Sequence, residues 1–203
     1  MKVLFNFSLL LILLAVVQVM AGEQARLNES APDFTLKDNK GETYTLSDLK
    51  GKYVVLEWVN FGCPFVRKHY DSGNMQKLQK TYTEKGAVWL SICSSADGKQ
   101  GYFDGDELDE KIAEEGVNAT AYLIDEDGTV GKMYGARTTP HMYIIDPEGK
   151  LIYVGGIDDR ASTKISDIDG ASNYVSAALD AAMAGKPVTV QTSKPYGCSV
   201  KYK

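Results

Sequence analysis

Hydrophobic and polar residues follow two different periods along the chain, and their order predicts an α/β fold. Short apolar, β-branched runs are typical of strands buried on both faces of a sheet, whereas apolar residues three and four positions apart indicate helices. These patterns predict strands at 53–59, 87–93 and 121–124, helices at 64–85, 107–115, 130–134 and 171–184, an N-terminal hairpin of 34–36 with 43–46, and a closing hairpin of 141–145 with 151–154. The alternation predicts a central mixed sheet with helices on both faces.

The N-terminal segment has the three-part pattern of a secretory signal peptide. Lys2 is followed by an apolar run over residues 3–19 and then by small residues at Ala21 and Gly22. We therefore expect residues 1–22 to be a signal peptide, 23–185 to form one domain and 186–203 to be an extended C-terminal tail. An uncleaved anchor is the alternative, because the apolar run is only just shorter than a membrane span. The expected location is periplasmic or secreted, with no stable membrane insertion after cleavage.

Charge and cysteine content narrow the classes of function. The net charge is −5, and the basic residues are scattered without the stripe that nucleic-acid binding requires. All three cysteines follow the signal segment, in a compartment where thiols tend to pair. Since three is odd, at least one thiol is free or pairs only transiently. There is no CxxC and no Cys/His cluster, so we expect no metal site, and nothing implies a bound organic cofactor.

Cys63 carries the chemistry that is most specific in the sequence. It stands in NFGCPFVRKHY, between a buried strand and a helix, with Pro64 suited to the first helical turn. Unpaired N–H groups and the positive end of the helix dipole favour a thiolate at that position. Arg67, four residues later, falls on the same face of the helix and is expected to hold the anion. The alternative is an inert cysteine at a helix start.

A strand-Cys-Pro-helix unit, a DxxG turn at 125–128, Thr139-Pro140 and an IDPEG turn follow one another along the chain. This order resembles the thioredoxin superfamily, and within it the peroxiredoxin-like redoxin branch, the alkyl-hydroperoxide-reductase and thiol-antioxidant group, over about 31–185. The resemblance implies a thioredoxin-like fold with Cys63 as the attacking cysteine. It also implies that Thr139 and Pro140 form a cis-proline loop beside the substrate groove, and X-Pro bonds adopt cis at low cost.

The sequence departs from the active-site motifs of both thioredoxins and peroxiredoxins. Val66 stands where thioredoxins have the second cysteine of CxxC. Leu56 and Asn60 stand where peroxiredoxins have a proline and a threonine or serine, so the hydroxyl that activates peroxide is missing, although Asn60 offers an amide.

Cys198 is the candidate for the second thiol. It lies in KPYGCSVKY, a segment expected to be flexible and accessible, and disulfide exchange needs an accessible sulfur. Cys93 closes a buried strand and remains an alternative partner. Of the two histidines, His69 is expected to be solvated or to cap the helix, and His141 is a candidate neighbour of the thiol.

We therefore predict an exported thiol-dependent oxidoreductase of the peroxiredoxin or thioredoxin type with antioxidant activity. Cys63 would reduce a peroxide or a disulfide, Cys198 would resolve it, and a reducing thiol protein would supply the electrons. The predicted substrate site comprises Asn60, Pro64, Arg67, Thr139 and Pro140. The alternative is a non-catalytic binding module that uses the same groove to hold a partner protein or a metal.

Overall fold

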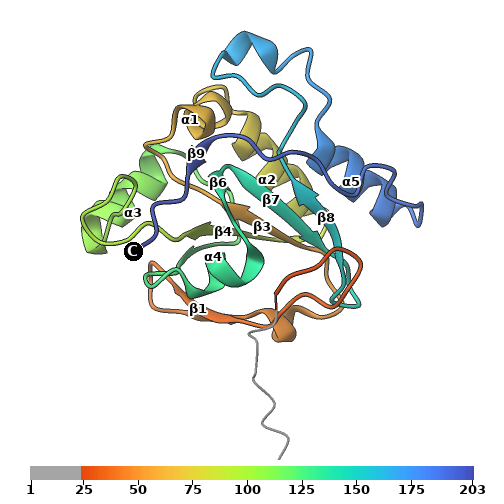
Figure 1. Cartoon of the computed structure of the whole chain (residues 1–203), viewed down its shortest axis with the longest axis horizontal. Coiled ribbons are helices and arrows are strands. Elements are labelled where there is room, and N and C mark those ends of the chain that lie inside the picture. Colours follow the sequence, from red (N-terminus) through yellow and green to blue (C-terminus); the bar gives the residue numbers. More distant parts are fainter. Residues whose placement is uncertain (1–23) are drawn as a thin grey trace, which may run out of the picture.

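The structure of the chain is a computed structural model that describes residues 24–203 (Figure 1). The expected signal peptide, 1–22, lies outside the described residues. Within 24–203, no helix is both long enough and apolar enough to span a bilayer.

A seven-stranded mixed sheet forms the centre of the fold. Its strands lie in the order β2-β1-β5-β4-β3-β7-β8. The three central strands β5, β4 and β3 are parallel, and the two outer pairs of strands are antiparallel. The bounds are β1 Thr35–Asp38, β2 Thr43–Thr45, β3 Val54–Trp58, β4 Val88–Cys93, β5 Ala121–Ile124, β7 His141–Ile145 and β8 Leu151–Gly155. Both predicted hairpins and all three predicted apolar strands are present.

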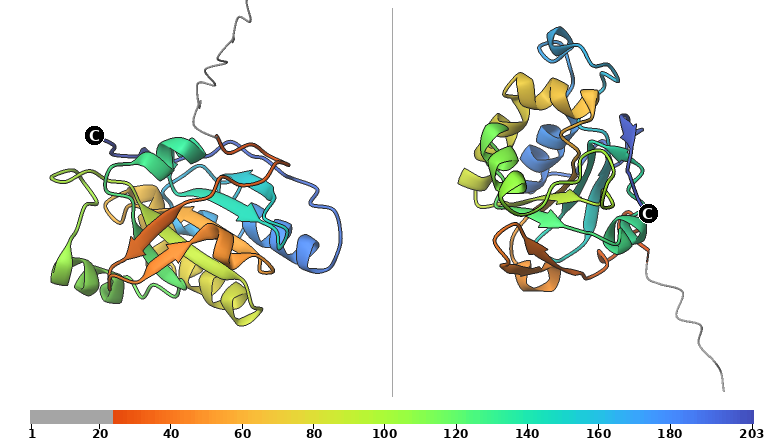
Figure 2. Two further views of the ribbon diagram at one scale, coloured as in Figure 1. Left: turned by 90° about the horizontal axis from the view of Figure 1, so that it is seen from below. Right: turned by 90° about the vertical axis from the view of Figure 1, so that its left-hand side faces the viewer.

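Helices cover both faces of this sheet, as the apolar runs predict (Figure 2). On one face, side chains of α1 (Pro64–Asp71), α2 (Asn74–Glu84), α3 (Gly105–Glu114) and α5 (Tyr174–Met183) pack in one core with Val55. On the other face, α4 (Thr129–Tyr134) and the 3-10 turn η1 (Leu46–Leu49) pack with Leu56 and Trp58. Successive residues of β3 therefore point into different cores, which explains why the strand has no polar face. A second 3-10 turn, η2, spans Ile165–Asp167.

The helix predicted at 64–85 is two helices. The chain breaks at Ser72 and Gly73, where Gly73 adopts a left-handed conformation with φ 71°. Glycine takes this conformation without the steric cost that a Cβ atom imposes, so α2 can start in a new direction. The hydrophobic spacing continues across the break, and for that reason the pattern alone did not indicate it.

The C-terminal tail is extended, but it is packed rather than free. Figure 1 shows it running back from α5 to a short strand, β9 (Cys198–Ser199), which pairs with β6 (Thr138–Thr139). In this antiparallel pair Cys198 lies opposite Thr139. Tyr196 is buried, with 9% of its surface exposed. The expectation of an accessible, flexible tail is therefore not met.

The break between α1 and α2 gives a test of the fold. Gly73→Ala should lower the free energy of unfolding by about 1 kcal/mol, because alanine is strained at a positive φ. Gly170→Ala is the matched control, since no atom lies within 4 Å of an added Cβ at either site and Gly170 has no positive φ. Urea unfolding of both variants measures the difference in their free energies of unfolding. Equal midpoints would contradict the left-handed conformation of Gly73 at the helix break.

Candidate active site

Cys63 follows the carboxyl end of β3 after a short loop and is the N-cap residue of α1. Its carbonyl accepts hydrogen bonds from the N–H groups of Val66 and Arg67, both at 2.9 Å. The loop before it is held by Asn60, whose side-chain oxygen accepts from the Gly62 N–H at 2.8 Å and whose amide donates to the Gln100 carbonyl at 2.9 Å. Both polar groups of Asn60 thus shape the loop.

The Cys63 sulfur is enclosed by residues of β6 and of the tail. Its thiol donates to the Thr139 carbonyl at 3.1 Å, and the Cys198 N–H donates to the sulfur at 3.3 Å. The Cys198 side chain is also close enough to this sulfur to lower the pKa of Cys63. The Thr139–Pro140 bond is cis, as the sequence predicts. No surface of Cys63 is exposed, although all three cysteines are free thiols.

These contacts favour the thiolate of Cys63 over that of Cys198. Burial acts against the charge, but hydrogen bonds from the Cys198 thiol and from the N–H groups of Cys198 and Val66 outweigh it, so the pKa of Cys63 falls below that of a free thiol. The Thr139 hydroxyl contributes least and makes no hydrogen bond of ordinary length. Burial, together with the bond and charge of Cys63, raises the pKa of Cys198 to about 11. The thiolate is therefore favoured on Cys63, and the protonated thiol on Cys198.

A buried carboxyl group lies on the α1 face of β3, six residues before Cys63. Glu57 is fully buried and accepts hydrogen bonds from the side chains of Tyr70, Gln79, Trp89 and Ser91 at 2.8–3.0 Å. Burial raises its pKa despite these bonds. This residue was missed from the sequence, although a single acidic residue inside the apolar run YVVLEWV is a detectable signal.

A second buried polar cluster joins α1 to the tail. The Tyr196 hydroxyl donates to Asp158, lies 3.2 Å from His69 Nε2 and 3.5 Å from Lys68 Nζ. Because the hydroxyl proton goes to Asp158, Nε2 of His69 carries a hydrogen and donates to Tyr196, and Nδ1 accepts from the Asn74 amide at 2.8 Å. His69 has no exposed surface, so the expectation of a solvated histidine is wrong.

The remaining candidates lie away from the sulfur. Arg67 forms ion pairs with Asp71 and Glu115, and it is not among the groups that shift the pKa of Cys63. The Cys93 thiol donates to the Gly101 carbonyl at 3.4 Å. His141 bonds through Nδ1 to the Tyr143 hydroxyl at 3.1 Å and accepts from the backbone N–H of Arg137 at 3.4 Å, instead of approaching the thiol.

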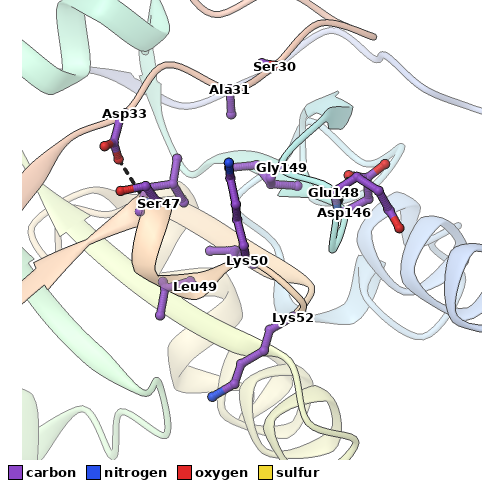
Figure 3. A pocket seen from close by; sticks show the side chains of 13 residues that line it. Ser30, Ala31, Asp33, Ser47, Leu49, Lys50, Lys52, Asp146, Glu148 and Gly149 are labelled. Atoms are coloured by element: carbon purple, nitrogen blue, oxygen red, sulfur yellow. Dashed lines mark hydrogen bonds between the residues drawn. The ribbon is translucent and has the colours of Figure 1, made fainter.

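The pocket drawn in Figure 3 is at the opposite end of the sheet. It has a volume of about 290 Å³ and lies where β3 begins at Val54 and β7 ends at Ile145. Lys50 extends past Gly149 there, while Asp33 accepts a hydrogen bond from the Ser47 N–H at 2.9 Å. The thiol pair, by contrast, lies at the end of β3 that leads to Cys63, so this pocket is separate from the thiol site.

Comparison with known proteins shows which class of protein this chain resembles. The chain is 31% identical over 147 residues to the thioredoxin-like protein YneN of Bacillus subtilis, covering 70% of this chain and 79% of that protein. It is 27% identical over 161 residues to the thiol-disulfide oxidoreductase ResA of Bacillus thuringiensis, covering 74% and 86%. The crystal structure of an uncharacterized conserved protein from Geobacillus kaustophilus matches with a TM-score of 0.72 and 30% identity, over 88% of this chain and 93% of that one.

These relatives and the fold define the class: a thiol-dependent oxidoreductase with a thioredoxin-like fold. The family model of the AhpC/TSA family matches residues 27–154. The chain belongs to the AhpC/TSA family, which confirms the resemblance seen in the sequence.

The two buried histidines predict a loss of stability in mild acid. Burial lowers the pKa of His141 to about 4, with the Arg137 charge adding to the effect, from 6.5 for an exposed histidine. Between these values the unfolded chain binds more protons, so stability falls as the pH drops through the window, by about 2 kcal/mol at pH 5 for one histidine. Urea unfolding at pH 7 and pH 5 should show that His141→Gln reduces this loss by about that amount. His69 contributes equally in both proteins, and an unchanged loss in the variant would contradict the prediction.

Thiol titration tests the contact between the two sulfurs. In a Cys93→Ala background, Cys198→Ala should raise the pKa of Cys63, because the thiol donor is lost while the backbone N–H remains. Thiolate absorbance against pH measures the midpoint. Cys93→Ala itself serves as the control, and a Cys63 midpoint that does not rise would show that the Cys198 thiol does not stabilise the thiolate.

Proposed function

We propose that this chain is an exported thiol-disulfide oxidoreductase whose redox pair is Cys63 and Cys198. One observation carries the proposal: the backbone N–H of Cys198 donates to the Cys63 sulfur at 3.3 Å. Of these two thiols, only Cys63 has a lowered pKa. The second thiol that thioredoxins keep three residues after the first is thus supplied from the far end of the chain.

The reaction follows from the asymmetry of the pair. The Cys63 thiolate attacks one sulfur of a substrate disulfide, that S–S bond breaks, and one substrate thiolate leaves with two electrons and takes up a proton. Cys198 then loses its proton and attacks the Cys63 sulfur of the mixed disulfide, which releases the second substrate thiol. The product is a Cys63–Cys198 disulfide, and a reducing thiol protein returns it to the dithiol by the same exchange in reverse.

The groups around the sulfur favour a disulfide substrate over a peroxide. Asn60, which occupies the place of the activating hydroxyl of peroxiredoxins, has both of its polar groups bonded within the loop. Peroxide reduction is the second candidate, and one observation favours it: the buried Thr139 hydroxyl lies near the sulfur and has no hydrogen-bond partner in the described part of the chain. Pro140 and Thr139 shape the groove for either substrate, whereas Pro64 begins the helix.

Stoichiometry with a small disulfide tests this function. Reduced protein mixed with oxidised glutathione should release two molecules of glutathione per chain, and Cys198→Ser should release one and retain glutathione on Cys63. Cys93→Ser is the matched control and should behave as the wild type. The products are identified by intact-protein mass, with hydrogen peroxide in a parallel stopped-flow experiment.

Two results would overturn parts of the proposal. If Cys63 reacts with oxidised glutathione no faster than a cysteine in an unstructured peptide, the chain is a binding module without turnover. If peroxide reacts and the disulfide does not, the second candidate replaces the first.

A further inference from the structure

Tyr196, two residues before Cys198, is the one buried residue of the tail, 186–203. Its hydroxyl reaches Asp158, His69 and Lys68, all of which are at most 3% exposed. Its ring lies 5.9 Å from the ring of Phe65, measured between centroids. Within the described residues, each polar atom of Tyr196, Asp158 and His69 has a partner, so the cluster is a complete network.

Such a network depends on every member. Lys68 Nζ bonds to the Arg160 carbonyl at 2.8 Å and lies 3.5 Å from Asp158, which also accepts from the Arg160 N–H at 2.9 Å. Removing one partner leaves the others buried with unsatisfied groups, which costs more than the net value of an ordinary hydrogen bond. The Tyr196 hydroxyl is the tail's contribution to this cluster. It therefore fixes the tail with more free energy than an exposed contact would.

The cluster connects the segments that carry both thiols to the same helix, α1. Lys68 and His69 belong to α1, which begins next to Cys63. Tyr196 fixes the tail on that helix, and Cys198 is only two residues further along the chain, a distance of about 7 Å in an extended chain. The chain between Tyr196 and Cys198 is packed closely against β6, because a Cβ atom on Gly197 would lie 2.0 Å from the Thr139 carbonyl oxygen.

We propose that Tyr196 is a positioning residue for the thiol pair: its buried hydroxyl fastens the tail to α1, which holds Cys198 against Cys63 and covers Cys63 until the tail lifts. The inference rests on the proposed function, in which Cys198 resolves Cys63. A substrate reaches Cys63 only in the lifted state, since no surface of Cys63 is exposed in the fastened one. Resolution occurs only after the tail returns.

Because the tail both covers Cys63 and carries Cys198, loosening it should have opposite effects on substrate attack and on resolution. Tyr196→Phe keeps the ring and removes the hydroxyl, so the tail lifts more often. Attack on Cys63 should become faster by about tenfold or more, the change expected from losing one hydrogen bond to a charged group. The second step, from the mixed disulfide to the Cys63–Cys198 disulfide, should become slower. A general loosening of the fold would not produce this pair of opposite changes.

Access is measured by the rate at which iodoacetamide modifies Cys63 in a Cys93→Ser, Cys198→Ser background. Resolution is measured by the release of the second glutathione in the Cys93→Ser background alone. Tyr53→Phe is the control, because it also removes a hydrogen-bonded tyrosine hydroxyl, one that donates to the Ala182 carbonyl at 2.8 Å and lies away from the tail cluster. The urea midpoint is recorded for each protein.

Gly197→Ala is a second variant that should displace the tail, and it does so by an independent cause. The added Cβ would collide with the Thr139 carbonyl while the Tyr196 hydroxyl stays in place. It should also speed modification of Cys63 and slow resolution, whereas Tyr53→Phe should change neither rate.

Modification rates that do not rise in either variant would overturn the inference. A rise that is matched by the same proportional rise for Tyr53→Phe, or one that merely follows a lower urea midpoint, would also overturn it. The proposed function fails separately, if wild-type protein forms no Cys63–Cys198 disulfide. The access measurement does not depend on that disulfide, because Cys198 is absent from its background.

Discussion

The pairing of the tail with β6 is the interaction on which the site depends. It brings the Cys198 N–H to the Cys63 sulfur while the Cys63 thiol bonds to the carbonyl of Thr139, the residue opposite Cys198. Without the tail, Cys63 would have only the helix start and β6 around it, as a lone cysteine. With the tail, it has a second thiol and the two hydrogen-bonding groups that lower its pKa most.

The energetics of the site come from competition between burial and hydrogen bonding. For Cys63, hydrogen bonds prevail and the thiolate is favoured, whereas for Cys198 burial and the neighbouring sulfur act together against a second charge. For Glu57, burial prevails over four hydrogen bonds and favours the protonated acid. Buried polar groups are costly unless fully satisfied. The clusters around Glu57 and Tyr196 therefore fix the positions of α1 and the tail, and with them the two thiols.

Local patterns predicted much of this fold, and long-range contacts account for what they missed. The apolar runs indicated the central strands because burial on both faces leaves a continuous signal, and Cys-Pro and Thr-Pro marked the residues that meet at the sulfur. The break at Gly73 was missed because the hydrophobic spacing continues through it. The Tyr196 cluster joins residues more than 120 positions apart. Its members look like ordinary surface residues in the sequence, and only the folded chain shows that they are buried together.

A disulfide map of the wild-type chain after one equivalent of a thiol oxidant tests the pairing of the two thiols. Proteolysis of the alkylated product and mass spectrometry identify which of the three cysteines are linked. We expect an intramolecular Cys63–Cys198 disulfide with Cys93 alkylated as a free thiol. A Cys63–Cys93 disulfide, or an over-oxidised Cys63 beside a free Cys198, would contradict it.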